Sequence, residues 1–192
     1  MSIIEKLQKV NSDYNHVSQI RNQDRSLALL SSGIYTEAER FVYELLQNAI
    51  DAFVDVDFDR LDIRISLIGD YFVFMHNGAA FSDSDIEGLC SVGNGNKSKN
   101  SKKVGYKGIG FKAVFIQSSL VYVQSGKTCC FKFDKEACFN LLPENLKAEL
   151  KRDNVPLYDD VPWQIIPIES NPPVKLDAEG FNVITRVCQL NS

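Results

Sequence analysis

The sequence is poor in histidine, has one tryptophan and lacks any long hydrophobic run. With only His16 and His76 present, a histidine-based zinc site is not expected, and the five cysteines show no Cys-x-x-Cys spacing. We therefore expect reduced thiols in a reducing compartment. Apolar runs such as YFVFM at 71–75 are far too short to span a bilayer, and the first sixteen residues carry charges too early for a signal peptide. These absences predict a cytoplasmic protein without membrane contact.

Neither sign of charge is in large excess. The net charge of −4 gives no general attraction to nucleic acid or to an anionic membrane. With 44% apolar and 24% charged residues, 192 residues suit one globular domain with a sizeable core. We expect an N-terminal helical segment at 1–34 and a domain at 35–192, together forming a fragment of, or a module for, a larger assembly.

Hydrophobic periodicity predicts helices and hairpins in place of alternating βαβ units. The expected elements are helices over 1–30 and 36–53, hairpins over 61–75 and 119–134, a helix starting near 111, and strands over 161–168 and 181–190. This order favours an α/β fold of the α+β sandwich kind, in which helices on one face cover a mixed, mainly antiparallel sheet.

The predicted helix at 36–53 contains the stretch ELLQNAIDAF. At about 100° per residue, one broad side is apolar and the opposite side carries a narrow polar stripe. The apolar side comprises Val42, Leu45, Leu46, Ala49, Ile50 and Phe53, and the stripe comprises Glu44, Asn48 and Asp51. Asn and Asp are mediocre in helix interiors. The stripe therefore either faces water incidentally or faces a ligand that wants carboxylates and an amide.

Glycine and lysine are concentrated in the middle of the chain. Residues 76–110 hold seven of the eleven glycines, and GYKGIGFK at 105–112 places Gly-x-x-Gly-x-Gly at the expected entry to a helix. Glycine amides and a helix N-terminus both favour a bound anion. Six lysines, at 97, 99, 102, 103, 107 and 112, lie in or beside this segment. We predict a phosphate-bearing ligand here and a functional lid over 93–105.

Three phosphate-binding motifs compete for this segment. No window supplies the Gly-x4-Gly-Lys-Ser/Thr of a Walker A loop. A dinucleotide fingerprint can be aligned on Gly108, Gly110 and Ala113 with Asp134 downstream, but it must directly follow a buried strand, which 96–107 cannot form. The third arrangement has an acidic and amide-bearing helix, a strand ending in a glycine turn, a lid and a glycine-rich helix entry. This chain presents those pieces in that order.

Five stretches carry a family resemblance: ELLQNAIDA, HNGAAF, SVGNGNK, GYKGIGFKAVF and TRVCQL, spanning about 35–190. Together they resemble the Bergerat-fold ATPase superfamily of Hsp90, DNA gyrase B, MutL and sensor histidine kinases, and within it the sacsin-like and plant no vein-like branch. The resemblance implies the Bergerat ATP-binding fold, Mg²⁺ as cofactor with ATP, and slow ATP hydrolysis driving a lid-closure switch. It also implies exchange of ATP and ADP, and homodimerisation on ATP binding.

The resemblance assigns roles around the phosphates. Glu44 becomes the base that activates water, Asn48 the Mg²⁺ ligand one turn later, and Asp51 a supporting residue. The phosphate loop comprises Gly105, Gly108, Ile109, Gly110 and Phe111, with Lys112 as a cationic contact and Lys97 as the lid lysine.

The resemblance also assigns roles around the base, with one departure from the superfamily. Thr185 matches the threonine near the adenine. Most members read Asp-x-Gly where this chain has His76, Asn77 and Gly78, and that aspartate accepts a hydrogen bond from the adenine amino group. A neutral His76 offers one acceptor nitrogen, and Asn77 is a second candidate. Which residue reads the base stays open.

Other functions remain as alternatives. The principal one is a non-hydrolysing module that senses nucleotide or scaffolds protein partners. Phosphoryl transfer to protein would require His16 as acceptor, and nucleic-acid binding by the lysine segment would require strongly salt-dependent affinity. The sequence does not identify the client, and chaperone-like work and DNA-directed or bacterial defence work both fit.

Overall fold

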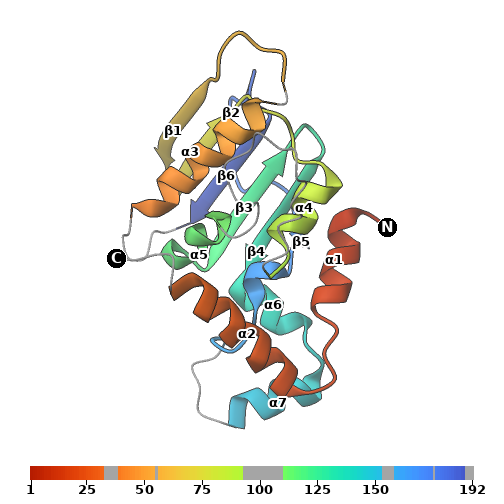
Figure 1. The fold of residues 1–192 in the computed structure, drawn as a ribbon. Helices are drawn as coiled ribbons and strands as arrows, with labels where there is room; N and C mark the ends of the chain where they lie inside the picture. The colour runs from red at the N-terminus through yellow and green to blue at the C-terminus, as the bar shows by residue number, and fades with distance from the viewer. Residues whose placement is uncertain (33–38, 55, 93–109, 153–157, 175, 189–192) are drawn as a thin grey trace, which may run out of the picture.

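A six-stranded sheet organises the protein, as seen in the computed structural model, which describes residues 1–32, 39–54, 56–92, 110–152, 158–174 and 176–188. Neighbouring strands pair antiparallel, in the order β1-β2-β6-β3-β4-β5 (Figure 1). The strands are β1 (Ile63–Ile68), β2 (Tyr71–His76), β3 (Leu120–Ser125), β4 (Cys129–Asp134), β5 (Ile168–Glu169) and β6 (Val183–Cys188). The predicted α+β class with an antiparallel sheet is confirmed.

Two hairpins build most of the sheet, as the alternating apolar pattern predicts. In β1-β2, Ile63 pairs with His76 and Ile68 with Tyr71, and Gly69 turns the chain with φ of 57°. In β3-β4, Gly126 turns the chain with φ of 62°. Both turns need the left-handed backbone that glycine adopts without steric cost.

The last strand, β6, lies in the centre of the sheet between β2 and β3. Thr185 pairs with Phe74 on one side and with Val123 on the other. Residues of β6 from Val183 to Val187 are all buried, because both faces of the sheet are covered here. Strand β6 thereby joins the two hairpins into one sheet.

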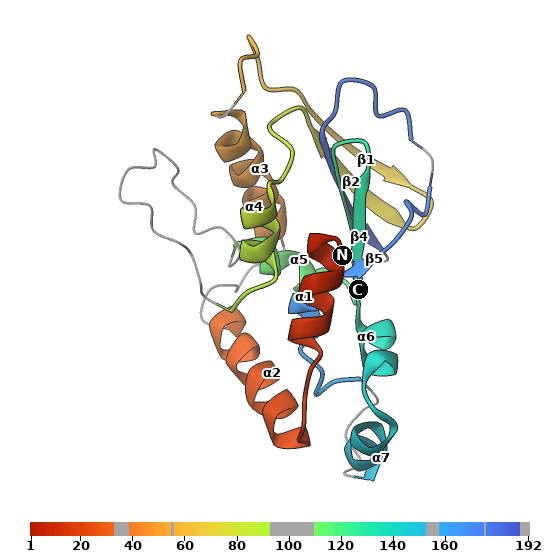
Figure 2. The ribbon, with the colours of Figure 1, turned by 90° about the vertical axis from the view of Figure 1, so that its right-hand side faces the viewer.

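Helices cover one face of the sheet. They are α1 (Ile3–Asn11), α2 (Val17–Ser32), α3 (Arg40–Phe53), α4 (Asp83–Leu89), α5 (Val114–Gln117), α6 (Lys135–Leu141) and α7 (Glu144–Arg152), with 3-10 turns η1 (Gly110–Ala113) and η2 (Trp163–Ile165). Figure 2 shows α3 and α4 on one side of the sheet and the connection from β5 to β6 on the other. That connection places Leu176 and Phe181 against Val73, Met75 and Ile184.

Three local predictions need correction. The expected helix over 1–30 is two helices, and Ser2 and Glu5 form a capping box at the start of α1. The expected strand over 161–168 contains the turn η2 and reaches a strand only at Ile168, because Pro162 and Pro167 have no N–H to donate to a sheet. The expected helix near 111 begins as the 3-10 turn η1 and continues only through the short α5.

The first two helices belong to the main core. Ile4 of α1 and Val17, Ile20 and Leu27 of α2 are buried in the same hydrophobic cluster as residues of α3 and the sheet. No helix in the described ranges is long and apolar enough to cross a membrane.

An aromatic cluster fixes η1 against the sheet. The ring of Phe115 lies 5.0 Å from those of both Phe133 and Trp163, and 5.7 Å from that of Phe111, all with edge-on geometry. Aromatic pairs at such distances and angles are favourable beyond their burial. The backbone around Gly110 is therefore anchored by the buried ring of the residue that follows it.

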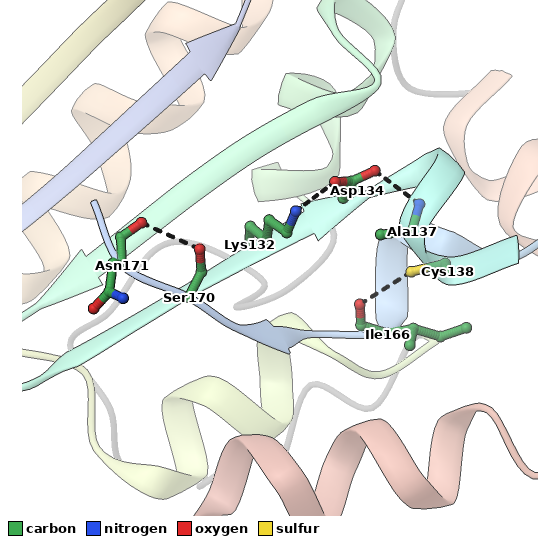
Figure 3. Close-up of polar contacts among 7 residues, drawn as sticks. All are labelled: Lys132, Asp134, Ala137, Cys138, Ile166, Ser170 and Asn171. Carbon is green, nitrogen blue, oxygen red and sulfur yellow. Dashed lines mark hydrogen bonds and ion pairs between the residues drawn. The ribbon is translucent and has the colours of Figure 1, made fainter. Parts of the chain in front are cut away.

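The end of β4 excludes the dinucleotide fingerprint. Asp134 accepts a hydrogen bond from the N–H of Ala137, which caps α6, and its other oxygen lies 2.6 Å from the Nζ of Lys132 (Figure 3). A ribose-binding carboxylate would have to be available to ligand. Moreover, every strand pair among the described residues is antiparallel, whereas the fingerprint requires a parallel βαβ unit.

Candidate functional site

Helix α3 carries the polar stripe, but its buried side is rotated relative to the predicted one. Phe41, Leu45 and Ala49 are buried, with Phe41 packing on Phe72 at 5.1 Å between ring centroids. Ile50, expected in the core, is 49% exposed, and Asp51, expected opposite the core, is 5% exposed. At about 100° per residue, Ile50 lies roughly opposite Phe41, so both cannot face the sheet. The polar stripe flanks the buried face and is not the solvated side.

Glu44 lies directly against Gly110. A Cβ built on Gly110 would stand 2.1 Å from the Oε2 of Glu44 and 3.0 Å from its Cδ, which only glycine avoids. The Oε1 of Glu44 lies 3.6 Å from the Nε of Arg40, one turn earlier. The Glu44 side chain is 22% exposed. The carboxylate therefore sits at the start of η1 with one edge still reachable by solvent.

Asn48 and Asp51 occupy the next two positions of the stripe. The Asn48 side chain is half-buried and forms no hydrogen bond within the described part of the chain. Asp51 is buried, and its Oδ1 accepts a hydrogen bond from the Nε2 of Gln47 at 3.1 Å. The carboxylate of Asp51 is therefore engaged within α3, and its supporting role stays a prediction.

The turn after β2 packs onto the other end of α3. A Cβ on Gly78 would lie 2.9 Å from the Cβ of Ala52 and 2.9 Å from the Nδ1 of His76. The N–H of Ala79 donates to the carbonyl of Ala52 at 2.9 Å. Helix α3 thus contacts Gly110 through Glu44, in its first half, and Gly78 through Ala52, near its end.

Asn77 uses both atoms of its side-chain amide to bind the chain that enters β1. Its Oδ1 accepts from the N–H of Asp62 at 2.8 Å, and its Nδ2 donates to the carbonyl of Arg60 at 3.1 Å. These two hydrogen bonds tie the Asn77 amide to the chain entering β1, and its contact with a ligand base stays a prediction. Asn182 in turn donates to the carbonyls of Asn77 and Gly78.

His76 is 3% exposed, and its Nδ1 accepts a hydrogen bond from the N–H of Gly78 at 3.2 Å. Burial lowers the pKa of its imidazole to about 4, so the ring is neutral at neutral pH. His76 shares a face of β2 with Phe74, whose ring lies 6.3 Å away, and Phe74 pairs with buried Thr185. His76 and Thr185 are thus on the helix-covered face of the sheet.

Lys112, expected as a phosphate contact, is buried and bonded to two backbone carbonyls. The side chain is 6% exposed, and its Nζ donates to the carbonyls of Leu89 at 2.7 Å and Gln164 at 3.2 Å. Burial lowers the pKa of Lys112 to about 8. The ammonium therefore joins the end of α4 to η2, and it is not directed at a ligand beside Glu44.

Asn11 makes a second connection between the end of α4 and η2, which no sequence pattern predicts. Its Nδ2 donates to the carbonyls of Cys90 at 2.9 Å and Ile165 at 2.6 Å, the neighbours of the two carbonyls that Lys112 binds. The partners are 79 and 154 residues away in the chain. No local pattern signals such a contact.

Four predicted residues, Lys97, Gly105, Gly108 and Ile109, lie outside the described residues, as does the expected lid. Phe111 is described, and its ring is buried in the aromatic cluster, so only its backbone can face a ligand. The structure therefore brings Glu44, Asn48 and Gly110 to one end of α3, and His76 and Gly78 to the other.

Acidification should destabilise the protein through His76. Because its folded pKa of about 4 lies below the usual 6.5, the unfolded state binds more protons between these values. Stability is fully present above pH 6.5 and is lost as the pH falls toward 4, by on the order of 3 kcal/mol. We expect His76→Asn, whose amide oxygen can still accept from Gly78, to remove this loss in urea unfolding followed across pH.

Comparing His76→Asn with wild type cancels the contribution of other groups that titrate in the same pH range. One of these is Asp24, whose burial raises its carboxyl pKa to about 6 and gives the opposite slope. The same substitution at the exposed His16 is the matched control. Parallel curves for wild type and His76→Asn would contradict the prediction.

Comparisons with known proteins identify the family of the chain. The sequence profile of the sacsin domain matches residues 29–172, a range that includes α3, the turn at Gly78 and η1. Protein NO VEIN from Arabidopsis thaliana is 34% identical over 111 residues, which are 57% of this chain and 4% of that protein. The chain thus matches only a small part of that relative's length. Because the profile covers well over half of the sequence, the chain belongs to the sacsin domain family.

Proposed function

We propose that the protein binds ATP with Mg²⁺ and hydrolyses it slowly, using a Bergerat-type site along α3. The observation that carries this proposal is the contact between the Glu44 carboxylate and Gly110 at the start of η1. It joins the acidic helix to the end of the glycine-rich segment, the two pieces that the resemblance requires to meet.

Glu44 suits the role of general base. Its carboxylate is partly exposed, and its ion pair with Arg40 orients it along the side of α3. In the proposed reaction, Glu44 accepts a proton from the water that attacks the γ-phosphate, and the bare Cα of Gly110 leaves room for this carboxylate beside the backbone of η1. With η1 only one 3-10 turn long, the support for phosphate comes from local N–H groups more than from a helix dipole.

Asn48 suits the role of a Mg²⁺ ligand. The described residues contain no group of three or more His, Cys, Asp or Glu side chains placed to hold an ion. Mg²⁺ commonly binds through one or two protein oxygens plus the phosphates of its nucleotide, and the Asn48 amide oxygen lies one turn from Glu44 with no hydrogen bond among the described residues. When bound, Mg²⁺ would neutralise phosphate charge that otherwise repels Glu44.

We expect slow turnover, well below the roughly 10 s⁻¹ typical of enzymes. Lys112 does not supply a cation for the phosphates, because its ammonium is bound by two carbonyls. A switch that closes on ATP, and dimerisation on binding, remain predictions of the resemblance. A non-hydrolysing nucleotide sensor is the outcome to be separated by the following experiments.

Replacing Glu44 with glutamine should preserve ATP binding and reduce hydrolysis. Loss of a general base typically costs about 10²–10⁴-fold in rate, and glutamine keeps the size of the side chain. Binding would be measured by isothermal titration and hydrolysis by phosphate release under single-turnover conditions. Glu39→Gln, at the exposed start of the same helix, is the matched control. Equal turnover in wild type and Glu44→Gln would exclude Glu44 as the base.

Replacing Asn48 with alanine should remove the Mg²⁺-dependent part of ATP affinity. The measurement is the ATP dissociation constant with Mg²⁺ and with EDTA, in wild type and variant. We expect Mg²⁺ to tighten binding about tenfold or more in wild type and to have little effect in Asn48→Ala. The exposed Asn15, changed to alanine, should behave as wild type. The same Mg²⁺ effect in all three proteins would remove Asn48 from the metal site.

Replacing Gly110 with alanine should displace the Glu44 carboxylate, since the new Cβ would need the space 2.1 Å from Oε2. The carboxylate is the end of a flexible side chain, so the protein should fold while hydrolysis falls. The informative control is the double variant with Glu44→Gln. If Gly110→Ala acts through Glu44, it should lower the rate little further in that background. Independent, multiplicative losses would show that the contact does not serve catalysis.

A further inference from the structure

The hydrogen bond between Gly78 and His76 decides which nitrogen of the imidazole carries the proton. The Gly78 N–H points at Nδ1 across 3.2 Å, and its hydrogen occupies the space between the two nitrogens, so Nδ1 cannot carry a second hydrogen there. A neutral imidazole has one N–H and one acceptor nitrogen. With Nδ1 as the acceptor, the proton is on Nε2.

This result reverses the expected chemistry of His76. The acceptor nitrogen that was expected to replace the family's aspartate is already used by the protein's own backbone. What remains is Nε2–H, a donor, which has no hydrogen-bond partner among the described residues. The low pKa of the buried ring keeps it neutral, so Nδ1 stays an acceptor at neutral pH.

The donor lies where a ligand would reach it if the proposed site is correct. His76 is on the helix-covered face of β2, beside Gly78, which packs on Ala52 of α3. Glu44 and Gly110 are about two turns away along the same helix. His76 as a residue is only 3% exposed, and a ligand atom that accepts from its Nε2–H would give this N–H a hydrogen bond that the described residues do not supply.

We propose that His76 makes this site select a purine that presents an acceptor, so that a 6-keto purine such as that of inosine triphosphate binds more tightly than adenine. The inference rests on the proposed nucleotide site and concerns its base specificity. The 6-keto oxygen accepts from Nε2–H directly. The 6-amino group of adenine is a donor and faces another donor, so ATP must shift to present ring nitrogen N1.

The first test is titration of the wild-type protein with Mg²⁺ and ITP, GTP, ATP or purine riboside triphosphate, which lacks a 6-substituent. We expect ITP to bind roughly threefold to tenfold more tightly than ATP, the worth of one net hydrogen bond. GTP shares the 6-keto group, so it shows whether the 2-amino group is tolerated. Purine riboside triphosphate should fall between ITP and ATP, because it has neither the acceptor nor the opposing donor.

A matched pair of variants tests the residue itself. In both His76→Asn and His76→Asp, one side-chain oxygen can accept from the N–H two residues on, as these residues do in Asx turns. The asparagine then presents an N–H and should keep the preference for ITP. The aspartate presents a second oxygen and should reverse the preference toward ATP. Melting temperatures check that both variants fold.

Each outcome separates this inference from the function on which it rests. Tighter binding of ATP than of ITP by wild type overturns the inference and leaves the nucleotide site standing. The same conclusion follows if His76→Asn and His76→Asp show equal preferences between ITP and ATP. If no triphosphate binds to wild type, the proposed function and the inference both fail. Should the variants unfold, nitrogen-15 NMR of wild-type His76 still decides the tautomer, and a proton on Nδ1 would overturn the argument.

Discussion

The candidate site depends on one close contact, the carboxylate of Glu44 against the bare Cα of Gly110. The contact exists because two independent requirements coincide. The helix must turn its polar stripe toward η1, and the position in η1 must lack a side chain. Any other residue at 110 would have to displace the carboxylate, so these two residues constrain each other although 66 positions separate them in the sequence.

The contact is held by packing on both sides. On one side, Phe111 follows Gly110 into a cluster of aromatic rings and fixes the backbone of η1. On the other, Phe41 and Leu45 hold α3 against the sheet, and Ala52 at its end receives Gly78. The polar groups of the site are therefore presented by a helix that cannot easily rotate. A preorganised arrangement of this kind suits a site that must hold charge in place.

Local sequence patterns predicted which strands and helices form. They predicted less well what each element packs against. Alternation of apolar residues gave both hairpins with their glycine turns, because a pleated strand repeats every two residues regardless of its neighbours. The 3.6-residue period located α3 but misplaced its buried side. Counting apolar residues assigned Ile50 to the core, whereas the sheet accepts the side of Phe41 and Leu45 and leaves Ile50 in water.

Side-chain roles set by distant partners could not be predicted. Lys112 looked like a phosphate ligand because of its place beside glycines, yet its ammonium binds carbonyls of α4 and η2. Asn77 looked like a base reader, yet its amide holds the start of β1. In both cases the motif identified a residue whose side chain binds backbone groups that the sequence did not reveal. A motif fixes which residue is present, and only the fold decides which of its hydrogen-bonding groups remain available.

The same reasoning explains why the two ends of α3 differ chemically. Near Glu44 the helix offers a carboxylate and an amide beside backbone, which suits a metal-bound anion. Eight residues later, at a rise of about 1.5 Å each, it meets a neutral ring flanked by buried apolar side chains, which suits an uncharged, flat group. A ligand matching both ends would carry a phosphate chain and an aromatic base about 12 Å apart. In the proposed site, the length of α3 would therefore set the spacing between phosphates and base, because it separates the two environments and its packing prevents them from moving independently.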